Sequence, residues 1–252
     1  MNIDKELVKC HFSKASCSYD RFANIQKEMA NELFESLPKV KNALEIGCGT
    51  GYFTKLLNSK CEHLDACDIS PQMVDVAKSR VCGVNFFVVD AERLDCGKYD
   101  LIASNATFQW FNNLDEALKQ YFNMLNSGGV IAFSTFGSDT FWELKEAFGV
   151  KSCKERRVTQ EFLTKDEIEE LLLKTGFIDI EVKSIKRVLF YDSINKMLQA
   201  IRGVGASNAI KGGYLGKECY RHFVDYYTKH FVKEDKVYCT YEIIYAKARR
   251  ES

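Results

Sequence analysis

Three carboxylates stand at the ends of short apolar segments in the first half of the chain. Glu45 lies near the end of the first segment, Asp68 follows the second, and Asp90 follows the third. Three glycines on alternate positions come directly after the first segment. Carboxylates at such places can accept hydrogen bonds from a cationic amino group, from ribose hydroxyls and from the exocyclic amine of an adenine. The pattern predicts a site for S-adenosylmethionine, with these three groups as the respective partners.

The glycines Gly47, Gly49 and Gly51 predict a sharp turn from a strand into a helix. Glycine tolerates positive φ and has no Cβ to hold a ligand away from the backbone. A nicotinamide cofactor is the first alternative, but its Gly-x-Gly-x-x-Gly fingerprint places the third glycine one residue later. Glu45 would also repel a pyrophosphate. The second alternative is a glycine-rich turn without a ligand.

Apolar and amphipathic segments alternate along the middle of the chain. This alternation predicts a parallel sheet with helices on both faces, whose ligands bind beyond the carboxyl ends of the strands. The expected strands are 40–46, 63–67, 84–89, 99–104, 129–135, 178–190 and 236–246, and the expected helices are 52–59, 71–80, 112–124 and 165–174. Thr164 and Glu167 form a capping-box pattern, 174–176 is a helix stop, and 127–129 is expected to be a turn.

Two helical segments flank this core. Residues 1–38 are expected to form helices broken near 16–18 and to lie over the cofactor site, with Tyr19 and Gln26 at the junction. Residues 191–235 interrupt the last two strands and are expected to form a helical lid for substrate. The core then comprises 39–190 and 236–252.

The lid and the fourth strand supply the expected substrate residues. Gln109 and Trp110 follow the strand that ends near Asn105, and a packing role is the alternative for Trp110. Arg202 lies between apolar residues, so we expect a buried partner for it. Arginine is a natural bidentate clamp for a carboxylate.

Composition excludes several classes of protein. Thirty-five basic residues balance thirty-five acidic ones in 252 residues, so no net field favours nucleic acid, and the length suits one large domain. No apolar run approaches the roughly 18 residues of a membrane span. Ten scattered cysteines without a C-x-x-C pair, and no secretory segment, predict free thiols in the cytoplasm. The four dispersed histidines suggest no metal site.

Several motifs resemble known methyltransferases. Leu44-Glu45-Ile46-Gly47-Cys48-Gly49-Thr50-Gly51, Asp68-Ile69-Ser70-Pro71-Gln72-Met73 and Asp90-Ala91-Glu92 resemble the class I S-adenosylmethionine-dependent methyltransferases. Narrower matches resemble the malonyl-acyl-carrier-protein O-methyltransferases of biotin synthesis. They are Tyr19-Asp20-Arg21-Phe22-Ala23-Asn24-Ile25-Gln26, Ser104-Asn105-Ala106-Thr107-Phe108-Gln109-Trp110, Phe133-Ser134-Thr135-Phe136-Gly137 and Ile201-Arg202-Gly203-Val204-Gly205-Ala206-Ser207-Asn208-Ala209.

The resemblance implies a Rossmann-like fold with a mostly parallel seven-stranded sheet. It implies methyl transfer from S-adenosylmethionine to the free carboxylate of malonyl-acyl carrier protein, with S-adenosylhomocysteine as product. Tyr19 and Arg202 are the expected catalytic residues, and Gln109, Trp110 and Arg202 are expected to contact substrate. The expected cofactor residues are Tyr19, Gln26, Glu45, Gly47, Cys48, Gly49, Gly51, Asp68, Ile69, Met73, Asp90, Ala91, Glu92, Asn105 and Gln109.

Acyl carrier protein is acidic, so a basic rim on a monomeric enzyme is expected from Lys211, Lys217, Arg221 and Arg187. Three alternatives remain open. They are a methyltransferase for a free small acid such as trans-aconitate, a carbon methyltransferase for a quinone ring, and a catalytically silent S-adenosylmethionine-binding protein.

Overall fold

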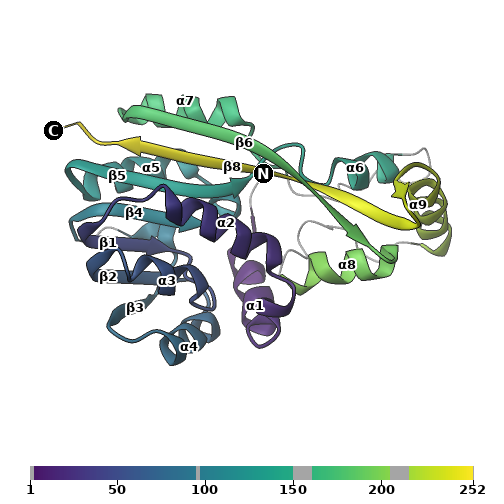
Figure 1. The fold of residues 1–252 in the computed structure, drawn as a ribbon, viewed down its shortest axis with the longest axis horizontal. Coiled ribbons are helices and arrows are strands. Elements are labelled where there is room, and N and C mark those ends of the chain that lie inside the picture. The colour runs from purple at the N-terminus through teal and green to yellow at the C-terminus, as the bar shows by residue number, and fades with distance from the viewer. Residues whose placement is uncertain (1–2, 95–96, 150–160, 205–215, 252) are drawn as a thin grey trace.

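One sheet organises the protein, as the computed structural model of residues 3–94, 97–149, 161–204 and 216–251 shows (Figure 1). In these residues eight strands pair in the order β3-β2-β1-β4-β5-β8-β6, and the short β7 pairs with β8. The expected mostly parallel seven-stranded sheet is confirmed, with β7 as an addition. The strands are β1 (Val40–Ile46), β2 (Cys61–Asp68), β3 (Val84–Val88), β4 (Tyr99–Asn105), β5 (Leu125–Phe136), β6 (Ile178–Tyr191), β7 (Val232–Lys233) and β8 (Lys236–Arg249).

The strand order reverses at β1, which pairs in parallel with β2 on one side and β4 on the other. Ile46 is in register with both Cys67 and Ser104, so the three strands end at the same edge. Chain segments that leave neighbouring strands in opposite directions open a crevice at this point. The fold thus creates a ligand site beside Glu45 and Asp68.

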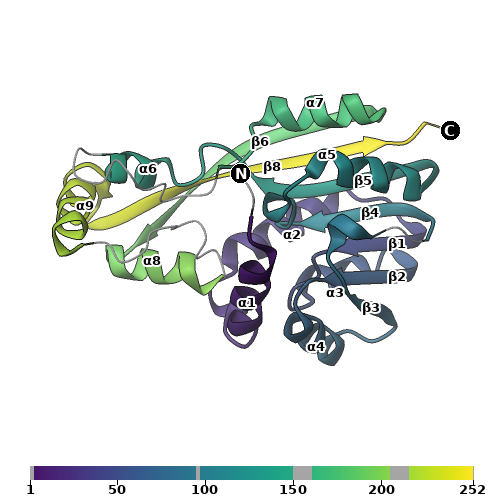
Figure 2. The same ribbon diagram turned by 180° about the vertical axis from the view of Figure 1, so that it is seen from behind.

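Helices cover both faces of the sheet (Figures 1 and 2). Alternate residues of β1 face opposite sides, since Leu44 and Ile46 pack in one core cluster and Ala43 packs in another. The first cluster includes α5 (Leu114–Met124) and α7 (Lys165–Thr175), and the second includes α2 (Asn24–Glu35) and α3 (Tyr52–Leu57). The remaining helical elements of this half are α1 (Lys5–Ala15), η1 (Tyr19–Arg21), α4 (Pro71–Arg80), η2 (Ala91–Arg93) and η3 (Phe108–Trp110).

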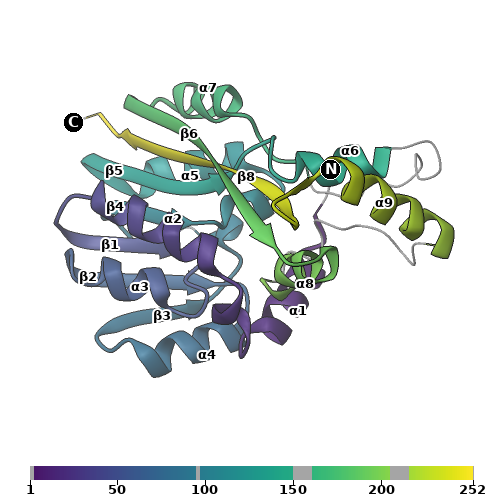
Figure 3. The ribbon, with the colours of Figure 1, turned by 45° about the vertical axis from the view of Figure 1, so that its right-hand side comes forward.

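The β6–β8 ribbon extends beyond the carboxyl end of β5. Phe136 pairs with Ile243, and Ile243 pairs with Ile185, so the ribbon continues past the last residue of β5. Figure 3 shows α6 (Trp142–Gly149), α8 (Ile194–Gly203) and α9 (Lys217–His230) gathered around this extension. Their core includes a stacked Phe148–Phe223 pair with ring centroids 4.1 Å apart. The expected helical character of 191–235 is therefore confirmed where the structure describes it.

Some expectations need correction. Residues 127–129 lie within β5 rather than in a turn before it, and the register shifts between Tyr99 and Leu101. The backbones of Gly128 and Gly129 instead bond to that of Arg250, a tertiary pairing that local glycine content does not reveal. The helix α6 was not expected.

The expectation of free thiols is wrong for Cys219, which is disulfide-bonded, because sequence spacing does not reveal which distant thiols the fold brings together. No disulfide involves Cys10, Cys17, Cys48, Cys61, Cys67, Cys82 or Cys239. No helix in the described ranges is long and apolar enough to cross a bilayer.

Candidate active site

The glycine turn after β1 adopts a backbone conformation with positive φ, which residues with a side chain rarely adopt. Gly47, Gly49 and Gly51 have φ of 76°, 52° and 88°. A Cβ on Gly47 would lie 2.0 Å from Oγ1 of Thr107, whereas a Cβ on Gly49 would meet no heavy atom within 4 Å. The turn is therefore packed against the loop after β4 on one side and open on the other.

Two adjoining cavities lie beside this turn, and Tyr19, Gly47, Gly49 and Asn105 line both. The first, called here the apolar cavity, has a volume of about 640 Å³ including its open mouth. Apolar side chains dominate its wall, with two carboxylates among them: Val8, Phe12, Ile69, Met73, Val89, Ala91, Trp110 and Phe111, together with Asp68 and Asp90. An adenine ring fits a wall of this kind.

The second, called here the polar cavity, has a volume of about 380 Å³. Its lining includes Asp20, Gln26, Lys27, Cys48, Thr50 and Tyr52. The side-chain Oε1 of Gln26 is buried and has no hydrogen-bond partner in the part of the chain that the structure describes. The amide oxygen of Gln26 can accept a hydrogen bond from an ammonium group, and the Lys27 ammonium can pair with a carboxylate. The polar cavity therefore suits the two charged groups of an amino acid.

Asp68 is held at the carboxyl end of β2 by backbone donors. Gly49 N donates to Oδ2 at 3.0 Å, and Ser70 N donates to Oδ1 at 2.8 Å. Burial raises the pKa of Asp68, while these hydrogen bonds lower it and only partly compensate. Each oxygen retains acceptor capacity, so both could also accept from hydroxyl groups, and the expected contact with a ribose stays a prediction.

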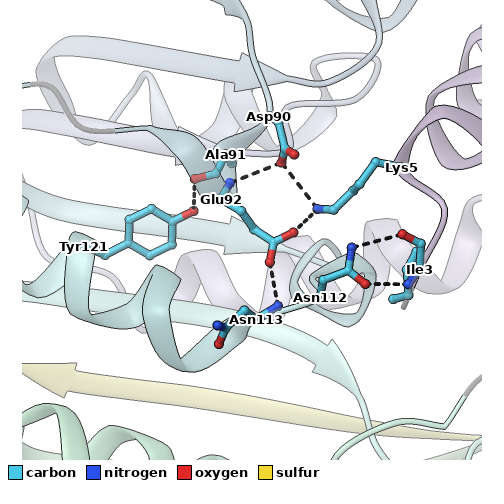
Figure 4. Close-up of polar contacts among 8 residues, drawn as sticks. All are labelled: Ile3, Lys5, Asp90, Ala91, Glu92, Asn112, Asn113 and Tyr121. Atoms are coloured by element: carbon cyan, nitrogen blue, oxygen red, sulfur yellow. Dashed lines mark hydrogen bonds and ion pairs between the residues drawn. The ribbon is translucent and has the colours of Figure 1, made fainter. Parts of the chain in front are cut away.

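Asp90 lines the apolar cavity, but its neighbours were not expected (Figure 4). Its Oδ1 accepts from Glu92 N at 3.2 Å and from Lys5 Nζ at 3.3 Å. Glu92 pairs with Lys5 as well, and its other oxygen accepts from Asn113 N at 2.6 Å. Glu92 does not line either cavity, so these contacts support a role in anchoring rather than in direct cofactor contact.

Glu45 is almost fully buried, at 1% exposure, and neither carboxylate oxygen has a hydrogen-bond partner among the described residues. Burial raises its pKa to about 8; the nearby Thr54 hydroxyl lowers the pKa and the Asp68 charge raises it further. Glu45 does not line either cavity. An unpartnered carboxylate beside the turn still provides an acceptor that a cation can stabilise.

Tyr19 stands where the two cavities meet. Burial raises the pKa of its phenol, and the charges of Asp68 and Asp20 raise it further, so the hydroxyl stays neutral. Asn105 is held there by two contacts: its Nδ2 donates to the Gln26 carbonyl at 3.1 Å, and its Oδ1 accepts from Ser134 at 2.6 Å. Cys48 is buried, which raises the pKa of its thiol and keeps it protonated.

The expected substrate residues are divided by the structure. Trp110 lines the apolar cavity and packs edge-on against Phe12, with ring centroids 5.6 Å apart. Gln109 lines neither cavity, because its amide donates to the Ala106 carbonyl at 2.6 Å and accepts from Thr135 at 3.0 Å. These contacts support a structural role for Gln109. Gly51 also lies outside both cavities and caps α3.

Arg202 is exposed at the end of α8, which corrects the expectation of a buried partner. The buried face of α8 consists of Ile194, Met197, Leu198 and Ile201, and Arg202 falls outside it. The neighbouring Gly203 lies against the N-terminal segment, since a Cβ there would be 2.3 Å from Cδ2 of Phe22. Arg202 is therefore next in sequence to Gly203, which packs against Phe22 in the segment that carries Tyr19.

The expected basic rim is only partly free. Arg187 pairs with Glu28 at 2.5 Å and with Glu32 at 3.6 Å. Lys217 and Arg221 are exposed on α9, and Lys211 lies outside the described residues. In the described ranges no group of three or more histidine, cysteine, aspartate or glutamate side chains could hold a metal ion.

Comparison with known proteins places the chain in a family. Residues 44–133 match the model of a methyltransferase domain. The malonyl-acyl-carrier-protein O-methyltransferase of Bacillus cereus is 35% identical over 99% of this chain and 98% of that protein. The protein of the same name from Acetivibrio thermocellus is 33% identical over 99% and 95%. The chain belongs to the malonyl-acyl-carrier-protein O-methyltransferase family.

Its fold is shared more widely. Phosphoethanolamine N-methyltransferase 2 of Haemonchus contortus, solved with phosphomonomethylethanolamine and S-adenosylhomocysteine, superimposes with a TM-score of 0.60 at 19% identity. The match covers 95% of this chain and 58% of that one. The resemblance and the fold expected from the sequence are both confirmed.

The side chains of this malonyl-acyl-carrier-protein O-methyltransferase family member fit S-adenosylmethionine. Asp68 and Asp90 supply carboxylate acceptors on the wall of the apolar cavity, and Gln26 and Lys27 supply an amide acceptor and a cation on the wall of the polar cavity. The unpartnered Oε1 of Gln26 is the most direct sign of a missing donor. Sequence reasoning missed Lys5, although Lys5, Val8 and Phe12 are spaced to share one helix face.

Proposed function

We propose that this protein transfers a methyl group from S-adenosylmethionine to the free carboxylate of malonyl-acyl carrier protein, giving the malonyl methyl ester that starts pimeloyl synthesis. The observation that carries this proposal is the near full-length similarity to malonyl-acyl-carrier-protein O-methyltransferases. A cavity pair with acceptors and a cation for the methyl donor supports it.

The substrate carboxylate needs no general base to activate it. A carboxylate is ionised near neutral pH and is already the nucleophile. When bound, S-adenosylmethionine supplies an electrophilic methyl group on its sulfonium. The chain's own residues then act by orienting the reactants and excluding water.

Each donor-binding side chain has a separate task. Asp68 accepts the ribose hydroxyls, Asp90 accepts the adenine amine, and Gln26 accepts the ammonium. Lys27 pairs with the amino-acid carboxylate. Tyr19 stands at the junction of the cavities, where the part of the donor between adenosine and amino acid must lie. Its neutral phenol orients this part without adding charge.

Arg202 is proposed to hold the malonyl carboxylate from the lid side. Its guanidinium is exposed, so it is accessible to a large carrier-bound substrate. The contact of Gly203 with Phe22 connects the end of α8 to the segment that carries Tyr19. We propose that the carrier docks on the exposed cations Lys217 and Arg221, which complement an acidic protein.

We propose a monomer that acts in the cytoplasm on a protein-bound substrate, without nucleic acid or membrane. Balanced charge supports the absence of nucleic acid, because 35 basic residues match 35 acidic ones.

The test is mass spectrometry of malonyl-acyl carrier protein after incubation with enzyme and S-adenosylmethionine. Malonyl-coenzyme A, free malonate and trans-aconitate are incubated in parallel. We expect a methyl ester on the carrier-bound malonyl group, formed faster than any other product. A faster reaction with a free acid would replace the proposed substrate, and no product in any tube with the donor bound would point to a quinone acceptor or a silent binder.

A further inference from the structure

The N-terminal helix α1 forms one wall of the apolar cavity. Lys5, Val8 and Phe12 line the cavity from this helix. The chain before α1 is attached by Asn112, whose Nδ2 donates to the Ile3 carbonyl at 3.0 Å and whose Oδ1 accepts from Ile3 N (Figure 4). These contacts therefore hold the start of α1 at the proposed S-adenosylmethionine site, called here the donor site because this molecule donates the methyl group. They lie outside the motifs at the strand ends.

Lys5 contacts two carboxylates and an aromatic ring. Its ammonium pairs with Asp90 Oδ1 at 3.3 Å and with Glu92 Oε2, and it lies 4.7 Å from the centroid of the Phe111 ring. The side chains of Lys5, Asp90 and Glu92 are 19%, 23% and 12% exposed. Because these charges are mostly removed from water, their interaction is screened less than that of a surface pair.

The contacts use one oxygen of Asp90 and leave the other. Lys5 Nζ and Glu92 N both donate to Oδ1. No hydrogen bond or ion pair to Oδ2 is present among the described residues. Glu92 is itself held by the backbone N–H of Asn113, so the cluster of Lys5, Asp90, Glu92 and Asn113 fixes the carboxylate of Asp90 from one side.

We propose that Lys5 is a positioning residue of the donor site, which holds Oδ1 of Asp90 so that Oδ2 stays directed to the adenine amine. This inference rests on the proposed use of S-adenosylmethionine, and it assigns a role to the N-terminal helix in recognising the base. Lys5 acts through Asp90. Removing its charge therefore weakens the recognition of the amine more than the general fit of the ring.

The experiment is isothermal titration of the full chain with S-adenosylhomocysteine and with S-inosylhomocysteine, in which a carbonyl replaces the adenine amine. We expect K5M to raise the Kd for S-adenosylhomocysteine about tenfold, the size of one lost charge-assisted contact. The Kd for S-inosylhomocysteine should change less than about twofold, because the group that Asp90 receives is absent.

Matched variants separate positioning from packing. K14M, on the same helix at an exposed position, should change neither Kd, and K5R should restore most of the affinity. D90N should remove the effect of K5M, so that the double variant binds no more weakly than D90N alone.

Equal weakening of both ligands by K5M would show that Lys5 only supports the wall, and an unchanged Kd for S-adenosylhomocysteine would also overturn the proposal. If K5M does not fold, K5Q gives the same comparison. These measurements use binding alone, so they stand apart from any failure of malonyl methylation.

Discussion

The donor site and the lid differ in what holds their side chains. Asp68 and Asn105 are the last residues of β2 and β4, Asp90 lies two residues after β3, and backbone or side-chain hydrogen bonds hold each of them. Arg202 stands exposed at the end of α8, which is carried on a ribbon that extends past β5. Sheet geometry therefore fixes the side chains proposed to bind S-adenosylmethionine, whereas the position of Arg202, proposed to bind the substrate, depends on how a separate helical layer packs.

The largest expected effect tests the lid alone. R202A should lower kcat/KM for malonyl-acyl carrier protein about 100-fold, because it removes a charge-assisted contact to the substrate carboxylate. The Kd for S-adenosylhomocysteine, measured by titration, should change less than about twofold. Lys196→Ala on the same helix is the control, since Lys196 pairs with Asp192 instead. A similar rise in the Kd for S-adenosylhomocysteine would show that Arg202 contributes to binding of the methyl donor and not only to binding of the substrate.

The second prediction concerns Glu45 in the donor half. Its pKa is raised from 4.5 to about 8, so the folded protein holds a proton that the unfolded chain releases. Stability from this group is therefore greatest at low pH and falls as pH rises through the interval between these values. Between pH 6 and pH 8 the unfolding free energy of the ligand-free protein should fall by about 2 kcal/mol from this source.

E45Q should remove this slope, as urea unfolding at both pH values would show. Glu35→Gln, at an exposed position, should keep it. If E45Q and the wild type lose stability equally over this interval, Glu45 does not titrate there.

The third prediction tests whether the polar cavity binds only the amino-acid part of the ligand. K27M should raise the Kd for S-adenosylhomocysteine about tenfold, because a cation facing the amino-acid carboxylate is lost. It should leave the Kd for 5′-methylthioadenosine unchanged, since that ligand has no amino acid. Lys55→Met, at an exposed position on α3, serves as the control. An equal rise in the Kd for both ligands would show that Lys27 does not contact the amino-acid part of S-adenosylhomocysteine.

The smallest effect tests the contact between the two regions. G203A places a Cβ against Phe22, so α8 or the Phe22 ring must shift. Overpacking of this kind costs about 1–3 kcal/mol where the surroundings cannot move, and a ring at the edge of a helix can partly adjust. We expect KM for malonyl-acyl carrier protein to rise about fivefold with the donor Kd nearly unchanged. An unaltered KM would show that the lid and the Tyr19 segment are not coupled through this contact.

The donor motifs were predictable because they are local. A glycine turn after a buried strand fixes where the following backbone goes, and Asp68 and Asp90 stand within a residue or two of strand ends. The walls of the two cavities include Tyr19, Gln26, Gly47, Cys48, Gly49, Asp68, Ile69, Met73, Asp90, Ala91, Asn105 and Trp110, and the roles of these residues stay predictions.

Other site features depend on contacts between distant segments. Gln109 is turned to Thr135 on a neighbouring strand, and Lys5 meets Asp90 although 85 residues separate them. Sequence spacing contains no information on which of several lysines makes such a contact. The division into 1–38, the core and the lid 191–235 also stays a prediction.

The amino-acid sequence alone determined the strand and helix alternation, the parallel core and the family, because each follows from periodicity or from short motifs. The tertiary structure decided that Arg202 is exposed, that Glu45 is buried without a partner, and that Lys5 joins the donor site. These outcomes depend on the packing of α8 and α1 against the sheet. Packing is a sum of many weak contacts between segments far apart in the chain, which no local pattern records.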